Sequence, residues 1–354
     1  MRSFRDRDRD RGPALRARRW AGGLALALVL PLAGCATGTG TGTGTDADAD
    51  SGRPGVSSTA PAPSATAAPE VRAQLRVDGD IREYLLHRPP APAADGDGGP
   101  RPLLVAFHGR GADAAELRAK TRLERAATAR GMLVAFPEGL GHGWGAGTRA
   151  TKQRPDPGLD VRFTEALVKH LVRTERADPG QVYVAGFSNG GSMALRMAAE
   201  RPALLAGAAS VSGQLPTGDA AVEPTGPVPV MVVYGADDPV RPLAGLPSPP
   251  PDPQEPILPT RSARDSAAAF AAAGGAGEPV TRQEKGYDRT VWRLGNEAPG
   301  GSRRPGGTVQ LLVVDDAGHT WPGSTVPPPE GFGPVSKALD ATDTILDFLT
   351  GPGR

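Results

Sequence analysis

The sequence is short of cysteine, of aromatic side chains and of any excess of charge. A single cysteine in 354 residues excludes an intrachain disulfide framework and a thiolate zinc cluster. Lys and Arg together number 40 against 39 acidic residues, a formal net charge of +1, so no overall attraction to nucleic acid is expected. Hydrophobic residues make up 38% of the chain, which is enough for a sizeable core that packing must stabilise.

The N-terminal segment has the features of a bacterial export signal. Residues 1–19 are rich in arginine, residues 21–33 form an apolar run, and the sequence LAGC ends at Cys35. The run is too short to cross a membrane as a helix, so residues 1–34 are predicted to be a signal peptide. The LAGC sequence resembles the lipobox of bacterial lipoproteins, which implies that Cys35 becomes the first mature residue and carries lipid. A buried core cysteine is the alternative.

Few large apolar side chains occur in residues 35–69, which are dominated by Thr, Gly, Ala, Asp and Pro. Such a segment cannot bury enough surface to offset its ordering entropy, so a flexible, lipid-anchored linker is predicted. The protein is therefore expected outside the cell, either anchored to the outer face of the bacterial cell membrane or released. Its catalytic domain is expected at residues 70–354.

That domain alternates two kinds of apolar pattern. A hairpin is expected around Asp78-Gly79. Continuous apolar runs predict buried strands, helical spacing predicts helices between them, and Asp160 is expected to cap one of these helices. Strands joined by helices require crossover connections, so a mostly parallel sheet with helices on both faces is predicted. A proline-rich stretch at 243–260 is expected to lie on the surface. The strand runs are 101–109, 131–139, 181–188, 205–213, 228–238 and 308–319, with helices at 114–130, 160–175 and directly after 188.

A serine between two glycines marks a candidate nucleophile. The sequence GFSNG at 186–190 follows a predicted strand and precedes a predicted helix. A sharp strand-to-helix turn exposes the hydroxyl of Ser188 but crowds the backbone, and glycine at 186 and 190 relieves that crowding. The N–H of Asn189 then begins a helix and can bind an oxyanion. The alternative, a serine packed in an ordinary turn, does not explain all three features together.

A base and an acid should follow the serine along the chain. Of the five histidines, only His319 follows Ser188 and closes a predicted strand, so it is the predicted base. Asp237 and Asp238 end the preceding strand, and their position alone does not choose between them. Asp315 and Asp316 lie too near the histidine and are weaker candidates.

The second oxyanion donor is expected in the loop after the first buried strand. The sequence HGR at 108–110 contains a glycine that lets the backbone approach a substrate. The N–H of Arg110 is therefore the predicted donor. His108 is interpreted as a structural, hydrogen-bonding residue.

Several motifs together resemble a known family. The chain is similar to secreted esterases grouped with polyhydroxybutyrate depolymerases and with feruloyl and acetylxylan esterases, which implies the α/β-hydrolase fold. That resemblance places the acid directly before a proline, and so at Asp238. It also implies that Trp144 and Trp321 line the substrate pocket, although a packing role suits either equally. The motifs are HG at 108–109, FPEG followed by WGAG, GFSNGGSMA, YGADDPV, GHTWPG and ALDATDTILDFL.

Two departures from that family concern the pocket. Cysteine pairs that many members carry are missing, and Gly145 stands where an asparagine is usual. The expected activity is hydrolysis of a small or polymeric carboxylic ester through an acyl-enzyme, with no metal or organic cofactor. The alternatives are an envelope acyltransferase with the same three residues and a surface binding protein without turnover.

Overall fold

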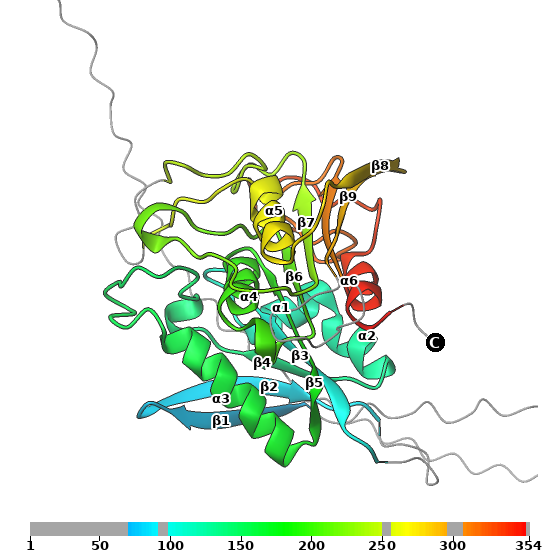
Figure 1. Ribbon diagram of the computed structural model, residues 1–354. Coiled ribbons are helices and arrows are strands. Elements are labelled where there is room, and N and C mark those ends of the chain that lie inside the picture. The colour runs from blue at the N-terminus through cyan, green and yellow to red at the C-terminus, as the bar shows by residue number, and fades with distance from the viewer. Residues whose placement is uncertain (1–69, 91–97, 250–255, 296–306, 352–354) are drawn as a thin grey trace, which may run out of the picture. The chain divides into compact units, whose positions relative to one another are not determined.

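Ten strands form one sheet through the middle of the domain (Figure 1). The computed structural model describes residues 70–90, 98–249, 256–295 and 307–351. The predicted signal peptide, Cys35 and the linker lie outside these residues. Within the described ranges, no helix has the length and apolar character that crossing a membrane requires.

The order of strands across the sheet is β1-β2-β4-β3-β5-β6-β7-β10-β9-β8. Neighbouring strands from β4 to β10 run parallel, and the two strands at each edge pair antiparallel. The strands are β1 (Val71–Val77), β2 (Asp80–His87), β3 (Arg101–Phe107), β4 (Leu133–Pro137), β5 (Ala177–Phe187), β6 (Gly207–Val211), β7 (Val230–Gly235), β8 (Val280–Glu284), β9 (Tyr287–Arg293) and β10 (Thr308–Val314).

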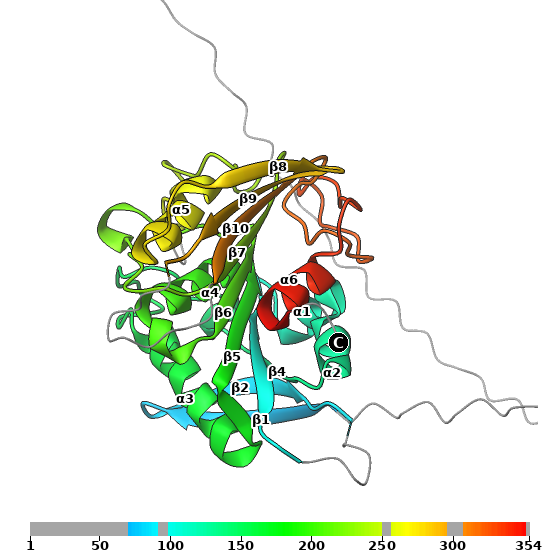
Figure 2. The ribbon, with the colours of Figure 1, turned by 45° about the vertical axis from the view of Figure 1, so that its right-hand side comes forward.

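Helices cover both faces of the sheet, as Figure 2 shows. The core therefore has two layers. One contains Phe163 of α3, Leu195 of α4 and Phe270 of α5, and the other contains Leu117 of α1 and Ile345 of α6. Central strands contribute to both layers because their side chains alternate, which explains their continuous apolar runs. The helices are α1 (Ala114–Thr121), α2 (Leu123–Ala129), α3 (Leu159–Thr174), α4 (Asn189–Glu200), α5 (Ala263–Ala273) and α6 (Ala341–Thr350).

The predicted α/β architecture and its six buried strands are confirmed, with three differences in detail. The helix predicted at 114–130 is two helices, separated at Arg122, whose φ is +54°. The prediction that Asp160 caps α3 is wrong, because Gly158 is the N-cap and Asp160 lies buried in the first turn. Helix α5 and the β8–β9 hairpin were not predicted. In the described parts of 243–260, Leu246 and Thr260 form only an isolated bridge.

The parallel register brings several strand ends to one edge of the sheet. Phe187 of β5 pairs with Val211 of β6, which in turn pairs with Val233 of β7. Further along, Gly235 at the end of β7 pairs with Val314 at the end of β10. Segments that follow these strands therefore leave the sheet side by side, and a site built from them can combine residues distant in sequence.

Candidate active site

Ser188 lies at a tight turn between β5 and α4. Its backbone is at φ +55° and ψ −117°, a region that non-glycine residues rarely adopt. The Ser188 N–H donates to Val211 O at 2.8 Å, which ties the turn to the neighbouring strand β6. Ser188 itself is half-buried. The strained turn therefore presents the hydroxyl at the carboxyl edge of the sheet.

The glycines on either side of Ser188 are required by close backbone contacts. A Cβ on Gly186 would overlap the carbonyl oxygen of Gly190. A Cβ on Gly190 would overlap the carbonyl oxygens of Phe107 and His108. The first contact is within the turn, whereas the second holds the start of α4 against the end of β3. The spacing of glycines thus reflects the geometry of the turn and its packing on the neighbouring strand.

Three side chains form a continuous hydrogen-bonded series. The Nε2 atom of His319 lies 2.7 Å from the Oγ atom of Ser188, and the Nδ1 atom lies 2.7 Å from Oδ2 of Asp238. A carboxylate only accepts hydrogen bonds, so Nδ1 carries the proton and Nε2 accepts from the serine hydroxyl. In this tautomer the imidazole can take the serine proton.

Asp238, and not its neighbour Asp237, faces the imidazole. Asp238 is 5% exposed, whereas Asp237 is exposed to solvent. The second oxygen of Asp238 accepts hydrogen bonds from the N–H groups of Val240 at 2.9 Å and Arg241 at 2.7 Å. These bonds fix the plane of the carboxylate. Asp315 and Asp316 are both exposed and do not take part.

His319 is 2% exposed and is enclosed by aromatic rings. Its ring centroid lies 5.1 Å from that of Phe187 and 5.3 Å from that of Phe332. Burial lowers the pKa of His319, and its hydrogen bond with Asp238 opposes that effect only in part. The imidazole therefore stays neutral, and able to accept a proton, to a lower pH than a free histidine.

The two predicted oxyanion donors lie beside Ser188. Asn189 is the first residue of α4, so its N–H has no partner within the helix. Arg110 lies in the loop that follows β3. Arg110 and Asn189 both line the cavity onto which Ser188 opens. The next N–H, of Gly111, donates to His142 O at 2.7 Å, which restrains that loop. Helix α4 also directs the positive end of its dipole to this point.

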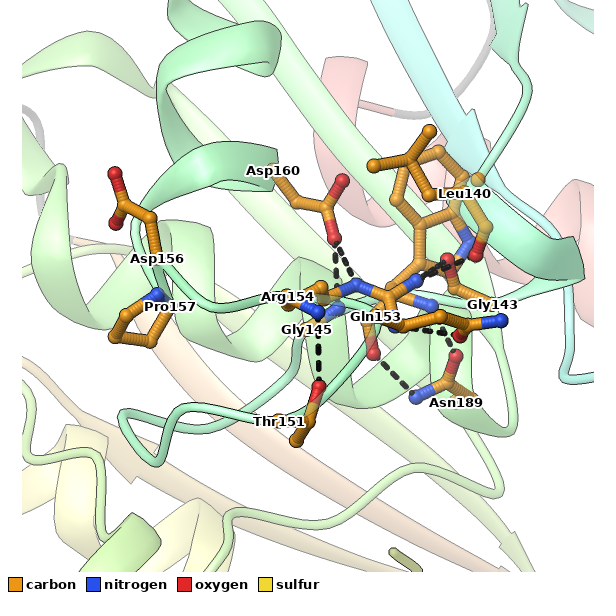
Figure 3. A network of polar contacts seen from close by, with 12 residues as sticks. Leu140, Gly143, Gly145, Thr151, Gln153, Arg154, Asp156, Pro157, Asp160 and Asn189 are labelled. Carbon is orange, nitrogen blue, oxygen red and sulfur yellow. Dashed lines mark hydrogen bonds and ion pairs between the residues drawn. The ribbon is translucent and has the colours of Figure 1, made fainter. Parts of the chain in front are cut away.

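A buried polar network holds Asn189 in place (Figure 3). The side chain of Asn189 accepts from the Trp144 N–H at 2.7 Å and donates to the Trp144 carbonyl at 3.0 Å. The loop that carries Trp144 is in turn bound by Arg154, which donates to the carbonyls of Leu140 and Gly143. The Arg154 Nε atom lies 2.8 Å from Asp160 Oδ2.

Asp160 joins this loop to the sheet. Its Oδ2 atom also accepts from the Gly145 N–H at 2.8 Å, and its Oδ1 atom lies 2.9 Å from Nη2 of Arg82 on β2. The side chains of Arg82, Arg154 and Asp160 are all at most 2% exposed. A Cβ at position 145 would meet Arg154 Cδ at 2.8 Å. The glycine that departs from the family pattern therefore makes room for this arginine.

The cavity at Ser188 has a volume of about 630 Å³, within the range of small-molecule sites. Its apolar wall includes Leu246 and Ile257, both from the proline-rich stretch at 243–260, and Val326 and Phe332 from the segment after His319. The stretch predicted to lie only on the surface thus contributes to the site. The arrangement can hold an ester with its carbonyl carbon near Ser188 Oγ.

The two tryptophans predicted to line this cavity lie in the core instead. Trp321 is 1% exposed, and its Nε1 atom donates to Thr342 at 3.0 Å. The Trp144 Nε1 atom donates to His108 O at 3.0 Å, and its ring stacks edge-on against Phe107. Trp144 borders a smaller neighbouring cavity, which shares Arg110, Asn189 and Arg241 with the cavity at Ser188. Both rings therefore pack within the core and stabilise the loops that carry the site residues.

The remaining histidines have structural positions. His108 is fully buried; it donates from Nδ1 to Gly109 O at 2.8 Å and accepts from the Gly139 N–H at 3.0 Å. Burial lowers the pKa of His108, which keeps this tautomer neutral. His87 ends β2, His170 lies on α3, and His142 is exposed.

Sequence reasoning missed Arg154, Asp160 and Arg241 as residues of the site. Asp160 lies on α3 and Arg154 in the loop before it, and nothing in the sequence marks the contact between their side chains, because the chain contains many other arginines. Arg241 lies three residues after Asp238 and lines the cavity. Its position beside a predicted acid was the one available signal.

The parallel sheet, the strained serine at a strand-to-helix turn and the Ser–His–Asp series together define an α/β-hydrolase with the fold of serine hydrolases. The family model described as phospholipase/carboxylesterase matches residues 160–246. "Putative esterase NocK" of Nocardia uniformis subsp. tsuyamanensis is 41% identical over 303 residues, which are 82% of this chain and 85% of that protein. The chain therefore belongs to this family of carboxylesterases, and it is a carboxylic ester hydrolase.

Other similarities are more distant. "Feruloyl esterase B" of Piromyces equi is 28% identical over 144 residues, 39% of this chain and 26% of that protein. "Bifunctional acetylxylan esterase/xylanase XynS20E" of Neocallimastix patriciarum is 28% identical over 142 residues, 39% of this chain and 19% of that protein. Among solved structures, an acetyl xylan esterase from Aspergillus awamori is 16% identical with a TM-score of 0.49, covering 79% of this chain and 98% of that chain.

Proposed function

We propose that the protein hydrolyses carboxylic esters through a covalent acyl-enzyme on Ser188. His319 takes the serine proton as Oγ attacks the ester carbonyl, and it then gives that proton to the departing alcohol. A water molecule, deprotonated by His319 in the same way, attacks the acyl-enzyme and releases the acid with regeneration of the serine. Asp238 holds the imidazole in the required tautomer and stabilises its protonated form.

The negative charge that develops on the carbonyl oxygen needs hydrogen-bond donors that are already oriented. We assign this role to the backbone N–H groups of Asn189 and Arg110, supported by the dipole of α4. The two hydrogen bonds between the Asn189 side chain and the Trp144 backbone restrain Asn189, and so the orientation of its N–H group. Removing one such donor in other enzymes lowers kcat by about 10²- to 10³-fold.

The observation that carries this proposal is the series from Asp238 through His319 to Ser188, in which both hydrogen bonds measure 2.7 Å. Ser188 in addition opens onto a cavity of about 630 Å³. Nucleophile, base and orienting acid are each within reach of the next, as the serine mechanism requires.

For the substrate, we propose esters with acetyl or phenolic acyl groups. The support is that relatives sharing part of this chain are named for feruloyl and acetylxylan esterase activity. Hydrolysis of polyhydroxybutyrate, which the sequence motifs also suggested, rests on that resemblance alone. A panel of acetyl, butyryl, hydroxybutyryl and feruloyl esters ranks these substrates by kcat/KM.

Replacement of Ser188 by alanine tests the mechanism. We expect activity on 4-nitrophenyl acetate to fall by several powers of ten, as loss of a nucleophile does in other serine hydrolases. Thermal unfolding of both proteins checks that the variant folds. Retained activity would contradict the proposal. Formation of more transfer product than free acid, when an alcohol acceptor is added, would favour the acyltransferase alternative.

We further propose that the protein is exported and attached to the membrane through lipid on Cys35. The support is the order of arginine-rich segment, apolar run and LAGC sequence. A linker of Thr, Gly and Ala then separates the catalytic domain from the lipid. The esterase would meet its substrate outside the cell.

A further inference from the structure

Among the described residues that line the cavity at Ser188, cationic side chains outnumber carboxylates. Lys120 and Arg241 are cations of this wall, and Glu116 is the one carboxylate that the structure describes there. Asp238 lies behind the imidazole and is committed to His319. An ester with no charge gains nothing from such a wall, whereas an anionic ester does.

Arg241 is the most unusual of these cations because its side chain is buried. It is 8% exposed, and its Nη1 atom donates to Ser192 Oγ at 3.1 Å. In the part of the chain that the structure describes, no carboxylate forms an ion pair with its guanidinium. The other buried arginines differ: Arg82 and Arg154 share Asp160, and Arg196 pairs with Glu200.

A buried charge of this kind is unfavourable. Removing a guanidinium from water costs free energy that only an opposite charge or a full set of acceptors restores. Burial lowers the pKa of Arg241 and the positive charge of Arg110 acts in the same direction, whereas Tyr234 and Asp238 oppose this effect only in part. The start of α4 adds its positive dipole, because Ser192 lies one helical turn after Ser188. The surroundings of Arg241 therefore favour an anion.

Lys120, on α1, is a second cation that lines the cavity. Its Nζ atom lies 4.6 Å from the centre of the Phe187 ring, and among the described residues it forms no ion pair with a carboxylate. Burial lowers the pKa of Lys120, and Glu116 compensates only in part. Lys120 thus increases the positive potential within the same cavity.

We propose that the ester substrate carries a carboxylate group, and that the guanidinium of Arg241 binds it. This rests on the proposed function, because it names the substrate class of the same site. Ser188 and Ser192 are separated by about 6 Å along the helix axis. The carboxylate therefore lies a few carbon atoms from the ester carbonyl, on either the acyl or the alcohol side.

Two matched pairs of substrates test this class. On the acyl side, the mono-4-nitrophenyl ester of adipic acid is compared with its counterpart in which a carboxamide replaces the free carboxylate. On the alcohol side, 4-carboxyphenyl acetate is compared with 4-carbamoylphenyl acetate. The carboxamides are neutral and of nearly the same size. Wild-type protein is expected to prefer the carboxylate in at least one pair, with the preference mainly in KM.

The Arg241→Gln variant should abolish that preference. Loss of one partner of a buried charge pair in other interfaces corresponds to on the order of 100-fold in affinity, so we expect the kcat/KM ratio of carboxylate to carboxamide to fall by about that factor. Arg241→Lys should restore part of the ratio because it keeps the charge. Arg282→Gln, on the exposed strand β8, removes one positive charge outside the cavity and should leave the ratio unchanged.

Two results would overturn the proposal. One is a wild-type protein that shows no preference for the carboxylate in either pair. The other is an Arg241→Gln variant, folded by its thermal unfolding curve, that loses the same factor of activity on carboxylate and carboxamide; that would indicate support of the oxyanion or of the Asp238 loop. Neither result affects the serine mechanism, which the Ser188→Ala variant tests separately.

Discussion

Replacing Asp160 with asparagine removes the one carboxylate that several buried groups share. Asp160 lies 2.9 Å from Arg82 Nη2 and 2.8 Å from Arg154 Nε, and it also accepts from the Gly145 N–H at 2.8 Å. An amide of the same shape has no charge, and its NH₂ group faces one guanidinium. Breaking a buried ion pair by removing one partner destabilises proteins by about 3–5 kcal/mol. That is a large share of the roughly 5–15 kcal/mol by which domains are stable.

Urea unfolding of the wild-type protein and the Asp160→Asn variant measures this change, provided that the m-values agree. The loop that holds Asn189 should also become more mobile. Loss of one oxyanion donor lowers kcat by about 10²-fold or more in other enzymes, so we expect kcat on 4-nitrophenyl acetate to fall at least about tenfold. The control is Asp347→Asn, whose exposed pair with Arg130 should contribute below about 1 kcal/mol. A loss of stability no larger than that of the control would refute the role assigned to Asp160.

Three further predictions concern the turn, the base and the anchor. Gly190→Ala should lower the thermal unfolding temperature, because its Cβ meets the carbonyls at the end of β3, whereas Gly277→Ala, with no neighbour near the added Cβ, should not; equal thermal unfolding of both variants would contradict this. Burial lowers the pKa of His319, so kcat/KM for a neutral ester should decline with falling pH at an apparent pKa below about 6.5. An apparent pKa at or above about 6.5 in the pH–rate profile would count against His319 as the base. Cys35→Ala should remove incorporated radiolabelled palmitate and release the protein from bacterial membranes, and label that persists in the variant would disprove lipid attachment at Cys35.

The central strands could be predicted from the sequence because each is buried on both faces. In a chain that alternates strands with helices, a short continuous apolar run such as 101–107 is typical of a strand inside a parallel sheet. The edge hairpin is different: β8 is exposed along its whole length, so its residues show no apolar pattern. The break between α1 and α2 was also hidden, because Arg122 adopts positive φ where neither glycine nor proline signals a turn.

Two residues of the site, Ser188 and His319, could be predicted from their order along the chain and from their positions at strand ends. In the structure their side chains lie within hydrogen-bonding distance. The choice of Asp238 over Asp237 depends on either the family resemblance or the structure, because adjacent acidic residues at a strand end cannot be distinguished by sequence position. The surroundings of Arg241 could not be read from the sequence, because an arginine is unusual only when its burial and its partners are known. The same holds for Asp160, whose two arginine partners are distant from each other along the chain.

The most direct measurement of the serine mechanism is identification of the residue that reacts with a fluorophosphonate probe. The folded protein is incubated with the probe, digested and mapped by mass spectrometry. We expect one adduct, on the peptide that contains Ser188, and much slower labelling in the His319→Ala variant because the hydroxyl then lacks its base. Labelling of a different residue, or none in folded wild-type protein, would contradict the mechanism.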